Sequence, residues 1–197
     1  MEIFLQWWGG IAYFLAKVFL VSADIAKKNN KIRLVGWLAF LIGLPTWVIF
    51  QAMNKNWMAS AMEIASIPSI LLGIIMAWKR YVNLNKIVDR SILIFTLFMI
   101  IVGIFYSVYT FNGIKTFSQL LEIVIIFCYL LSIYLLAKRN PFSWLMLIIG
   151  HVSMSYLMFI QKNYILWIQQ IVSIIPAIIG LMNNMKEAKS KNISMPK

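Results

Sequence analysis

Residues 91–111 read SILIFTLFMIIVGIFYSVYTF and contain no Asp, Glu, Lys, Arg or His. A helix of about 20 apolar residues is long enough to cross the hydrocarbon core of a bilayer. Backbone amides and carbonyls find no water there, so only helices and closed barrels satisfy them. Barrel strands alternate apolar and polar residues, and this stretch does not alternate. The stretch therefore predicts a transmembrane helix.

Similar runs recur along the 197-residue chain, of which 62% is hydrophobic and 12% charged. Val21, Ser22 and Ala23 imitate a signal-peptidase site after the first run. A signal peptide begins with positive charge, whereas this chain begins with Glu2, so we interpret the first run as a span. The sequence thus predicts an all-α membrane protein of seven transmembrane helices, at about 5–25, 34–52, 58–78, 91–111, 117–137, 142–160 and 164–182.

The net charge of +12 reflects basic residues that gather in alternate loops, which favours a membrane protein over a nucleic-acid binder. One side of the predicted bundle holds Lys27, Lys28, Lys31, Arg33, Lys79, Arg80, Lys86, Arg90, Lys138, Arg139, Lys186, Lys189, Lys191 and Lys197. The opposite loops hold only Lys55, Lys115 and Lys162. Because basic loops remain in the cytoplasm, we expect the N-terminus outside and the C-terminus in the cytoplasm of a cell, or inner, membrane.

An internal repeat relates the two ends of the chain at an offset of 107 residues. Without a gap, the register pairs Trp37/Trp144, Gly43/Gly150, Lys55/Lys162, Asn56/Asn163, Glu63/Gln170, Ser66/Ser173 and Gly73/Gly180. Matches of Trp, Gly, Asn and Ser in one register are not a product of apolar composition alone. The pattern predicts two parallel three-helix repeats, 1–80 and 113–185, joined by a linker helix in 81–112 and followed by a basic tail, 186–197.

This arrangement of three, one and three helices is similar to that of the SWEET sugar transporters, and the local sequence resembles the PnuC-type vitamin transporters. The second resemblance rests on the stretch from Tyr134 through Lys138, Arg139 and Trp144, on Lys162-Asn163-Tyr164, and on a last helix with Gln170, Ala177 and Gly180. It implies passive movement of a water-soluble vitamin such as nicotinamide riboside, thiamine or riboflavin. It also implies a cytoplasmic kinase that traps the product.

A transporter of a small metabolite is therefore the first functional hypothesis, working by alternating access or facilitated diffusion among membrane lipids. The enzyme alternative lacks support, because the chain has one histidine and no phosphate loop or metal-ligand pattern, and no cofactor is expected. A receptor, channel or non-transporting subunit would share these features. Substrate identity, coupling ion and oligomeric state stay open, and a dimer or trimer is compatible with the pattern.

Ionisable residues within spans are functional candidates, because burying one at a helix centre costs about 2.5–3.5 kcal/mol. Lys17 is the deepest, and we expect it either to pair with Glu63 or Glu122 or to line a pathway. Asp24 is interpreted as an ion-pair partner of nearby Lys27 and Lys28 at the interface. His151 either packs between helices or binds a ligand. A metal site at His151 is not expected, because no second His or Cys shares its helical face.

A polar stripe on the third span, Glu63 and Ser66, corresponds in the repeat to Gln170 and Ser173. Equivalent helices would turn these groups toward a central pathway, although interhelical hydrogen bonding explains them too. Aromatic faces suit ring-bearing ligands. The predicted substrate-binding residues are Glu63, Gln170, Trp47, Trp167, Lys17, His151, Ser66, Ser173, Glu122 and Tyr106.

Overall fold

Seven helices form the part of the chain that the computed structural model describes, residues 2–26, 29–53, 57–79, 86–110 and 112–193. They are α1 (Glu2–Ile25), α2 (Asn30–Met53), α3 (Trp57–Trp78), α4 (Lys86–Thr110), α5 (Phe117–Ala137), α6 (Phe142–Ile160) and α7 (Tyr164–Ile193). Each is long and apolar enough to cross a membrane. The prediction of an all-helical chain with seven potential spans is confirmed for these residues.

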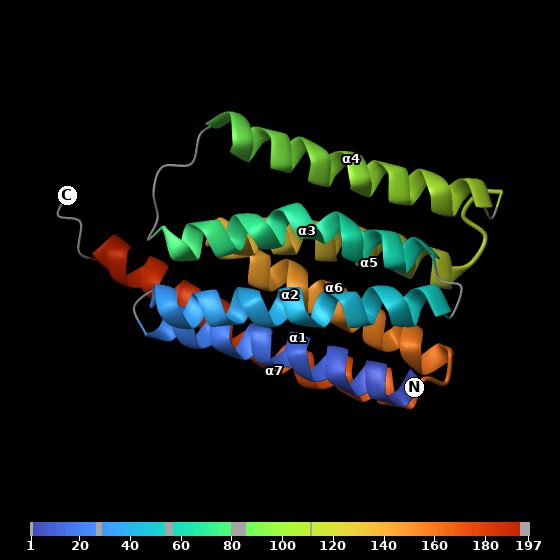
Figure 1. The fold of residues 1–197 in the computed structure, drawn as a ribbon, viewed down its shortest axis with the longest axis horizontal. Helices are drawn as coiled ribbons and strands as arrows, with labels where there is room; N and C mark the ends of the chain where they lie inside the picture. Colours follow the sequence, from blue (N-terminus) through green and yellow to red (C-terminus); the bar gives the residue numbers. More distant parts are fainter. Residues whose placement is uncertain (1, 27–28, 54–56, 80–85, 111, 194–197) are drawn as a thin grey trace.

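Six of the helices form a closed ring, and the seventh lies beside it. Going round the ring, α1 packs against α2, α2 against α3, α3 against α5, α5 against α6, α6 against α7, and α7 against α1. Helix α4 contacts only α3 and α5 among the described helices. Figure 1 shows α4 apart from the rest of the bundle, with the two termini at opposite ends.

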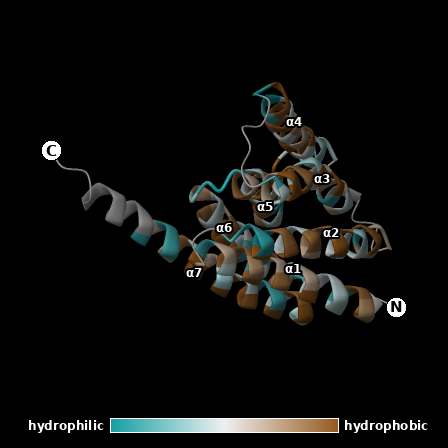
Figure 2. Cartoon of the chain, turned by 60° about the vertical axis from the view of Figure 1, so that its left-hand side comes forward, coloured by the Kyte–Doolittle hydropathy of each residue, from teal (hydrophilic) through white to brown (hydrophobic). Residues whose placement is uncertain are grey.

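The outer surface of the bundle is apolar, as a lipid-facing surface must be. Ile42, Phe98, Ile101 and Phe105 are among its large exposed side chains. Figure 2 shows hydrophobic residues along the helices and hydrophilic ones near the C-terminal end of α7. Water would disfavour so much exposed hydrocarbon, whereas bilayer lipid accommodates it.

Two of the helix ends are closed by residues in the left-handed conformation. Arg139 (φ 55°) follows α5 and Lys162 (φ 59°) follows α6. In each case the next amide bonds a carbonyl five residues back, Asn140 to Leu135 at 2.9 Å and Asn163 to Met158 at 2.9 Å. These bonds satisfy end carbonyls that have no partner within the helix, and they allow the chain to reverse in a few residues.

The helices extend beyond several predicted boundaries, because hydropathy detects the apolar part of a helix and not its polar ends. Helix α2 begins at Asn30 rather than 34, and α4 begins at Lys86 rather than 91. Helix α7 continues to Ile193, so most of the predicted tail is helical. The predicted loop residues Lys27, Lys28, Lys55, Asn56, Arg80 and Lys197 lie outside the described residues, as do 81–85, where the predicted linker begins.

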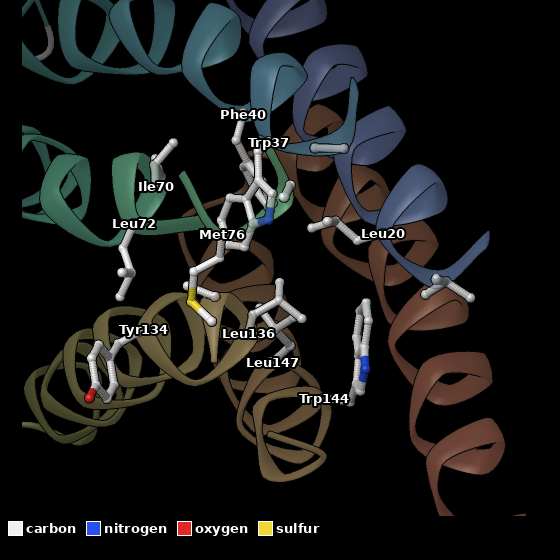
Figure 3. Close-up of a cluster of buried hydrophobic side chains, with 14 of the residues drawn as sticks. Leu20, Trp37, Phe40, Ile70, Leu72, Met76, Tyr134, Leu136, Trp144 and Leu147 are labelled. Atoms are coloured by element: carbon white, nitrogen blue, oxygen red, sulfur yellow. The ribbon is translucent and has the colours of Figure 1, made fainter. Parts of the chain in front are cut away.

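A cluster of buried side chains fills the bundle toward the end at which the predicted basic loops lie. Two tryptophans, Trp37 from α2 and Trp144 from α6, are almost completely buried in it. Figure 3 shows Trp37, Met76, Leu136 and Trp144 within this cluster. An added Cβ at Gly73 would lie 2.2 Å from the Trp37 ring, and one at Gly180 2.5 Å from the Trp144 ring. Both indoles thus rest directly on a neighbouring helix backbone, which only glycine permits at this distance.

Candidate functional site

A cavity of about 100 Å³ lies at the centre of the helical ring. Each of the six ring helices contributes three residues to its lining, and α4 contributes none. Phe40 and Leu147 belong both to this lining and to the buried tryptophan cluster or its margin, so the cluster closes one end of the cavity. The ring therefore encloses a central site that touches both the first three and the last three helices.

One half of the cavity, supplied by α1 and α3, carries charge. Lys17 is 4% exposed and Glu63 faces the same cavity. The hydroxyl of Tyr13 donates a 2.5 Å hydrogen bond to Glu63 Oε2. No salt bridge within 4.0 Å joins Lys17 and Glu63, since the described pairs are Asp24–Arg33 and Asp89–Lys138. Their charges thus face the cavity without direct contact.

The other half of the cavity is polar and is lined by α5, α6 and α7. Gln170 Oε1 accepts a hydrogen bond from the Tyr129 hydroxyl at 2.9 Å and lies 2.6 Å from His151 Nδ1. Tyr129 also lies 2.8 Å from Nδ1. An amide oxygen has no proton, so with the Gln170 amide placed as it is Nδ1 donates to Gln170, and in the neutral form of the imidazole Nε2 is then the acceptor nitrogen. That Nε2 is buried and has no hydrogen-bond partner among the described residues.

Close backbone approach at Gly9 and Gly10 brings α1 against α2 and α7 beside the cavity. The indole nitrogen of Trp47 lies 2.9 Å from where a Cβ on Gly9 would stand. The Gln169 amide would lie 2.3 Å from a Cβ on Gly10, and its nitrogen donates to Gln6 O at 3.1 Å. That bond fixes the amide orientation, so Gln169 Oε1 remains without a partner in the described structure. Gln169 and Gln170 thus both line the cavity, and their amides bond different partners.

A larger cavity of about 500 Å³ adjoins the central one and shares Gln51, Met62 and Met154 with it. Its other lining residues include Gln6 at the start of α1 and Asn163 before α7. These positions lie at the end of the bundle that carries the N-terminus. We call this space the vestibule. It lies between the central cavity and that end of the bundle.

The opposite end is held together by a buried ion pair. Arg33 Nη1 lies 2.6 Å from Asp24 Oδ1, and the Arg33 side chain is 1% exposed. Arg33 Nη2 donates to the main-chain oxygen of Leu136 at 2.5 Å, and Arg139 donates to the side chain of Asn30. These bonds join α1 and α2 to the end of α5. The described partner of Asp24 is therefore Arg33, whereas the expected partners Lys27 and Lys28 lie outside the described residues.

The structure brings seven of the predicted site residues together around the central cavity: Lys17, Trp47, Glu63, Ser66, His151, Gln170 and Ser173. The Ser66 hydroxyl donates a 2.6 Å hydrogen bond to the main-chain oxygen of Glu63.

Three predicted residues lie elsewhere. Glu122 lines the vestibule. Trp167 packs against Phe159, with ring centroids 5.7 Å apart. Tyr106 is 49% exposed on α4 and lines a separate cavity of about 250 Å³ between α3, α4 and α5.

Among the lining residues outside the predicted set, Tyr13 and Tyr129 hold the polar groups in place. Tyr13 lies on the same face of α1 as Lys17, at a spacing of four residues, and this spacing was the available signal. Tyr129 gave no signal, because a tyrosine in an apolar span is usually interpreted as packing. Its partners are 22 and 41 residues away in the chain, so only the tertiary structure reveals them.

The arrangement suits reversible binding of a small polar molecule. It offers an ammonium, a carboxylate, two phenol groups, an imidazole, three amides and two serine hydroxyls inside an otherwise apolar bundle. Among the described residues no group of three or more His, Cys, Asp or Glu side chains is placed to hold a metal ion. Comparisons with protein-family models, curated proteins and solved structures found no match to this chain.

Proposed function

We propose that this protein transports a small water-soluble metabolite, of vitamin or nucleoside-like size, across a membrane by alternating access or facilitated diffusion. The observation that carries the proposal is the central cavity, lined equally by six helices, with a vestibule at one end and a packed cluster at the other. A site at the middle of a bundle, reached from one side at a time, is the arrangement that alternating access requires.

The proposal treats α1–α3 and α5–α7 as two parallel three-helix repeats, with α4 as the linker. Several residue pairs that are 107 apart in the sequence share features that support this proposal. Glu63 and Gln170 both line the cavity, as do Ser66 and Ser173. The Trp37–Gly73 contact has its counterpart in Trp144–Gly180. Helix α4 lies outside the ring, as expected for a linker. These correspondences support a PnuC-type transporter with a SWEET-like architecture.

Movement would consist of rocking one repeat against the other about the central site. In the state described here the repeats are bonded at the end that carries the basic residues, through Arg33 and Leu136. Opening that end requires this bond and the contacts of the tryptophan cluster to separate. Pro45, Pro68 and Pro176 lie inside α2, α3 and α7 and remove helix hydrogen bonds at which these helices can bend.

The orientation proposed from the basic residues places the N-terminus outside and the C-terminus in the cytoplasm of the cell membrane. The vestibule then opens to the exterior and the bonded end faces the cytoplasm. A substrate would enter from the vestibule, and a cytoplasmic kinase acting on it would prevent its return. The protein itself is proposed to have no enzymatic activity.

The test is saturable counterflow by the purified protein in proteoliposomes. The compounds are nicotinamide riboside, thiamine, riboflavin, uridine and glucose, each screened first by thermal stabilisation. We expect one chemical class to stabilise the protein and to exchange across the membrane with saturation. Non-saturating flux would indicate a channel, and binding without flux a receptor or a subunit that needs a partner. Either result would reject transport by this chain alone.

A further inference from the structure

The balance of charge in the central cavity limits what it can bind. Lys17 and Glu63 are the lining residues with formal charge, one positive and one negative. With His151 as the neutral imidazole, the lining sums to zero. Transfer of a proton from Lys17 to Glu63 would leave that sum unchanged, so the balance does not depend on which group holds the proton.

The two groups are also placed to be bridged. Glu63 is fixed on one oxygen by Tyr13 at 2.5 Å. The Lys17 ammonium has no salt bridge within 4.0 Å in the described structure, although Glu63 lines the same cavity. A ligand between them can offer an acceptor to the ammonium and a donor to the carboxylate. Hydrogen bonds to charged groups are stronger at low dielectric, so such a bridge would stabilise both the buried pair and the bound ligand.

A ligand with net charge would upset this balance. It would add an uncompensated charge to a cavity within the bundle, where desolvation is costly and no further counter-charge lines the wall. The opposite wall can only exchange neutral hydrogen bonds, through Tyr129, Gln170 and the free Nε2 of His151.

We infer that the transported substrate has no net charge and bridges Lys17 and Glu63 through an acceptor group and a donor group. This inference rests on the proposed function and narrows it. Among vitamin and nucleoside-like compounds it selects neutral or zwitterionic molecules over cations and anions. The cavity of about 100 Å³ holds the bridging polar end, and the vestibule of about 500 Å³ has room for the remainder.

The experiment uses four ribosides of nearly one size and different charge. Nicotinamide riboside is a cation, nicotinic acid riboside is a zwitterion, dihydronicotinamide riboside is neutral, and dihydronicotinic acid riboside is an anion. Thiamine, riboflavin and pantothenate add a second cation, neutral molecule and anion. Binding to the full-length protein is measured by calorimetry and transport by counterflow. We expect the neutral and zwitterionic compounds to bind at least tenfold more tightly than the ions.

Charge variants make the test specific. Glu63→Gln gives the cavity a net positive charge and should shift the preference toward the anions, while its amide can still accept the Tyr13 bond. Lys17→Met should shift the preference toward the cations. Because either single change leaves a buried charge, the double variant Lys17→Met/Glu63→Gln provides the folding check. We expect it to fold, to bind neutral compounds at least tenfold more weakly, and to show no preference by charge.

Asp89→Asn on α4, which lines neither the central cavity nor the vestibule, and Lys115→Met in an exposed loop are the matched controls, and both should keep the wild-type preference. Transport of a cation or an anion in preference to the neutral compounds, or an unchanged preference in both single variants, would overturn the inference and leave transport standing. Absence of binding and counterflow for all seven compounds would instead reject the vitamin transporter proposal, and the inference with it.

Discussion

Arg33 donates a 2.5 Å hydrogen bond to the main-chain oxygen of Leu136, a residue 103 positions further along the chain, while its other terminal nitrogen is paired with Asp24 at 2.6 Å. One guanidinium thus connects the first two helices to the fifth. The group is almost completely buried. The closed end of the bundle therefore depends on a side chain that has little access to water.

Replacing Arg33 with Gln is expected to destabilise the protein by roughly 3–5 kcal/mol, because the buried Asp24 carboxylate then loses the counter-charge that it contacts directly. The double variant Arg33→Gln/Asp24→Asn should recover much of that loss. Thermal unfolding in detergent measures both. Arg90, which is exposed on α4, supplies the control: Arg90→Gln should change stability by less than about 0.5 kcal/mol. Equal effects at Arg33 and Arg90 would argue against the role given to the pair.

The contacts between indoles and glycines predict a graded response to added methyl groups. Gly73→Ala and Gly180→Ala should each destabilise the fold by about 1–3 kcal/mol, because their Cβ atoms would meet tryptophan rings at 2.2 and 2.5 Å. Gly150→Ala, whose nearest contact is Tyr129 at 3.2 Å, should cost less. The order is read from unfolding temperatures. A larger effect at Gly150 than at either of the others would contradict the packing described.

Tyr129→Phe removes a hydroxyl that contacts both His151 and Gln170. Loss of a buried hydrogen bond of about 1 kcal/mol should weaken substrate binding by roughly threefold to tenfold. The matched control is Tyr134→Phe on the same helix, whose hydroxyl bonds Asp89 at 3.1 Å and lies away from the cavity. Counterflow should report a higher half-saturation concentration for the first variant only. A similar change in both would indicate a general effect on α5.

The orientation can be tested through the single cysteine, Cys128, which is buried. In a Cys128→Ala background, a cysteine at Lys115 should react with a membrane-impermeant maleimide in intact cells. A cysteine at Arg90 should react only after the cells are permeabilised, because the basic end is expected to face the cytoplasm. The reverse pattern would invert the proposed topology and place the vestibule on the cytoplasmic side.

The fold was largely predictable, because a bilayer imposes one length and one polarity on every span. What hydropathy did not find were the polar helix ends, such as Lys86–Arg90 in α4, which are helical without being apolar. An ion pair of Asp24 was predicted from the sequence, but its partner Arg33 was not. Lys27 and Lys28 are nearer to Asp24 in the sequence, whereas Arg33 meets Asp24 because α1 and α2 pack together at the same end of the bundle.

The site was predictable where polarity itself was the signal. Lys17, Glu63, His151 and Gln170 are conspicuous in apolar helices, and they do line one cavity. Tyr106 and Trp167 were chosen by residue type, and only tertiary packing determines which way an aromatic ring faces. Tyr106 lies on α4, and this helix contributes no residue to the lining of the central cavity.

The cavity has one charged half and one neutral half, and this division has a consequence for engineering. The two residues with formal charge, Lys17 and Glu63, come from α1 and α3, whereas α5, α6 and α7 contribute only residues without formal charge. Mutations in α1 and α3 alone should therefore change the net charge of the substrate that the proposed transporter accepts. Mutations in α5, α6 and α7 would change the shape and the hydrogen-bonding pattern of the cavity without changing its charge. For the proposed transporter, substrate charge and substrate shape would then be set by two separate stretches of the gene.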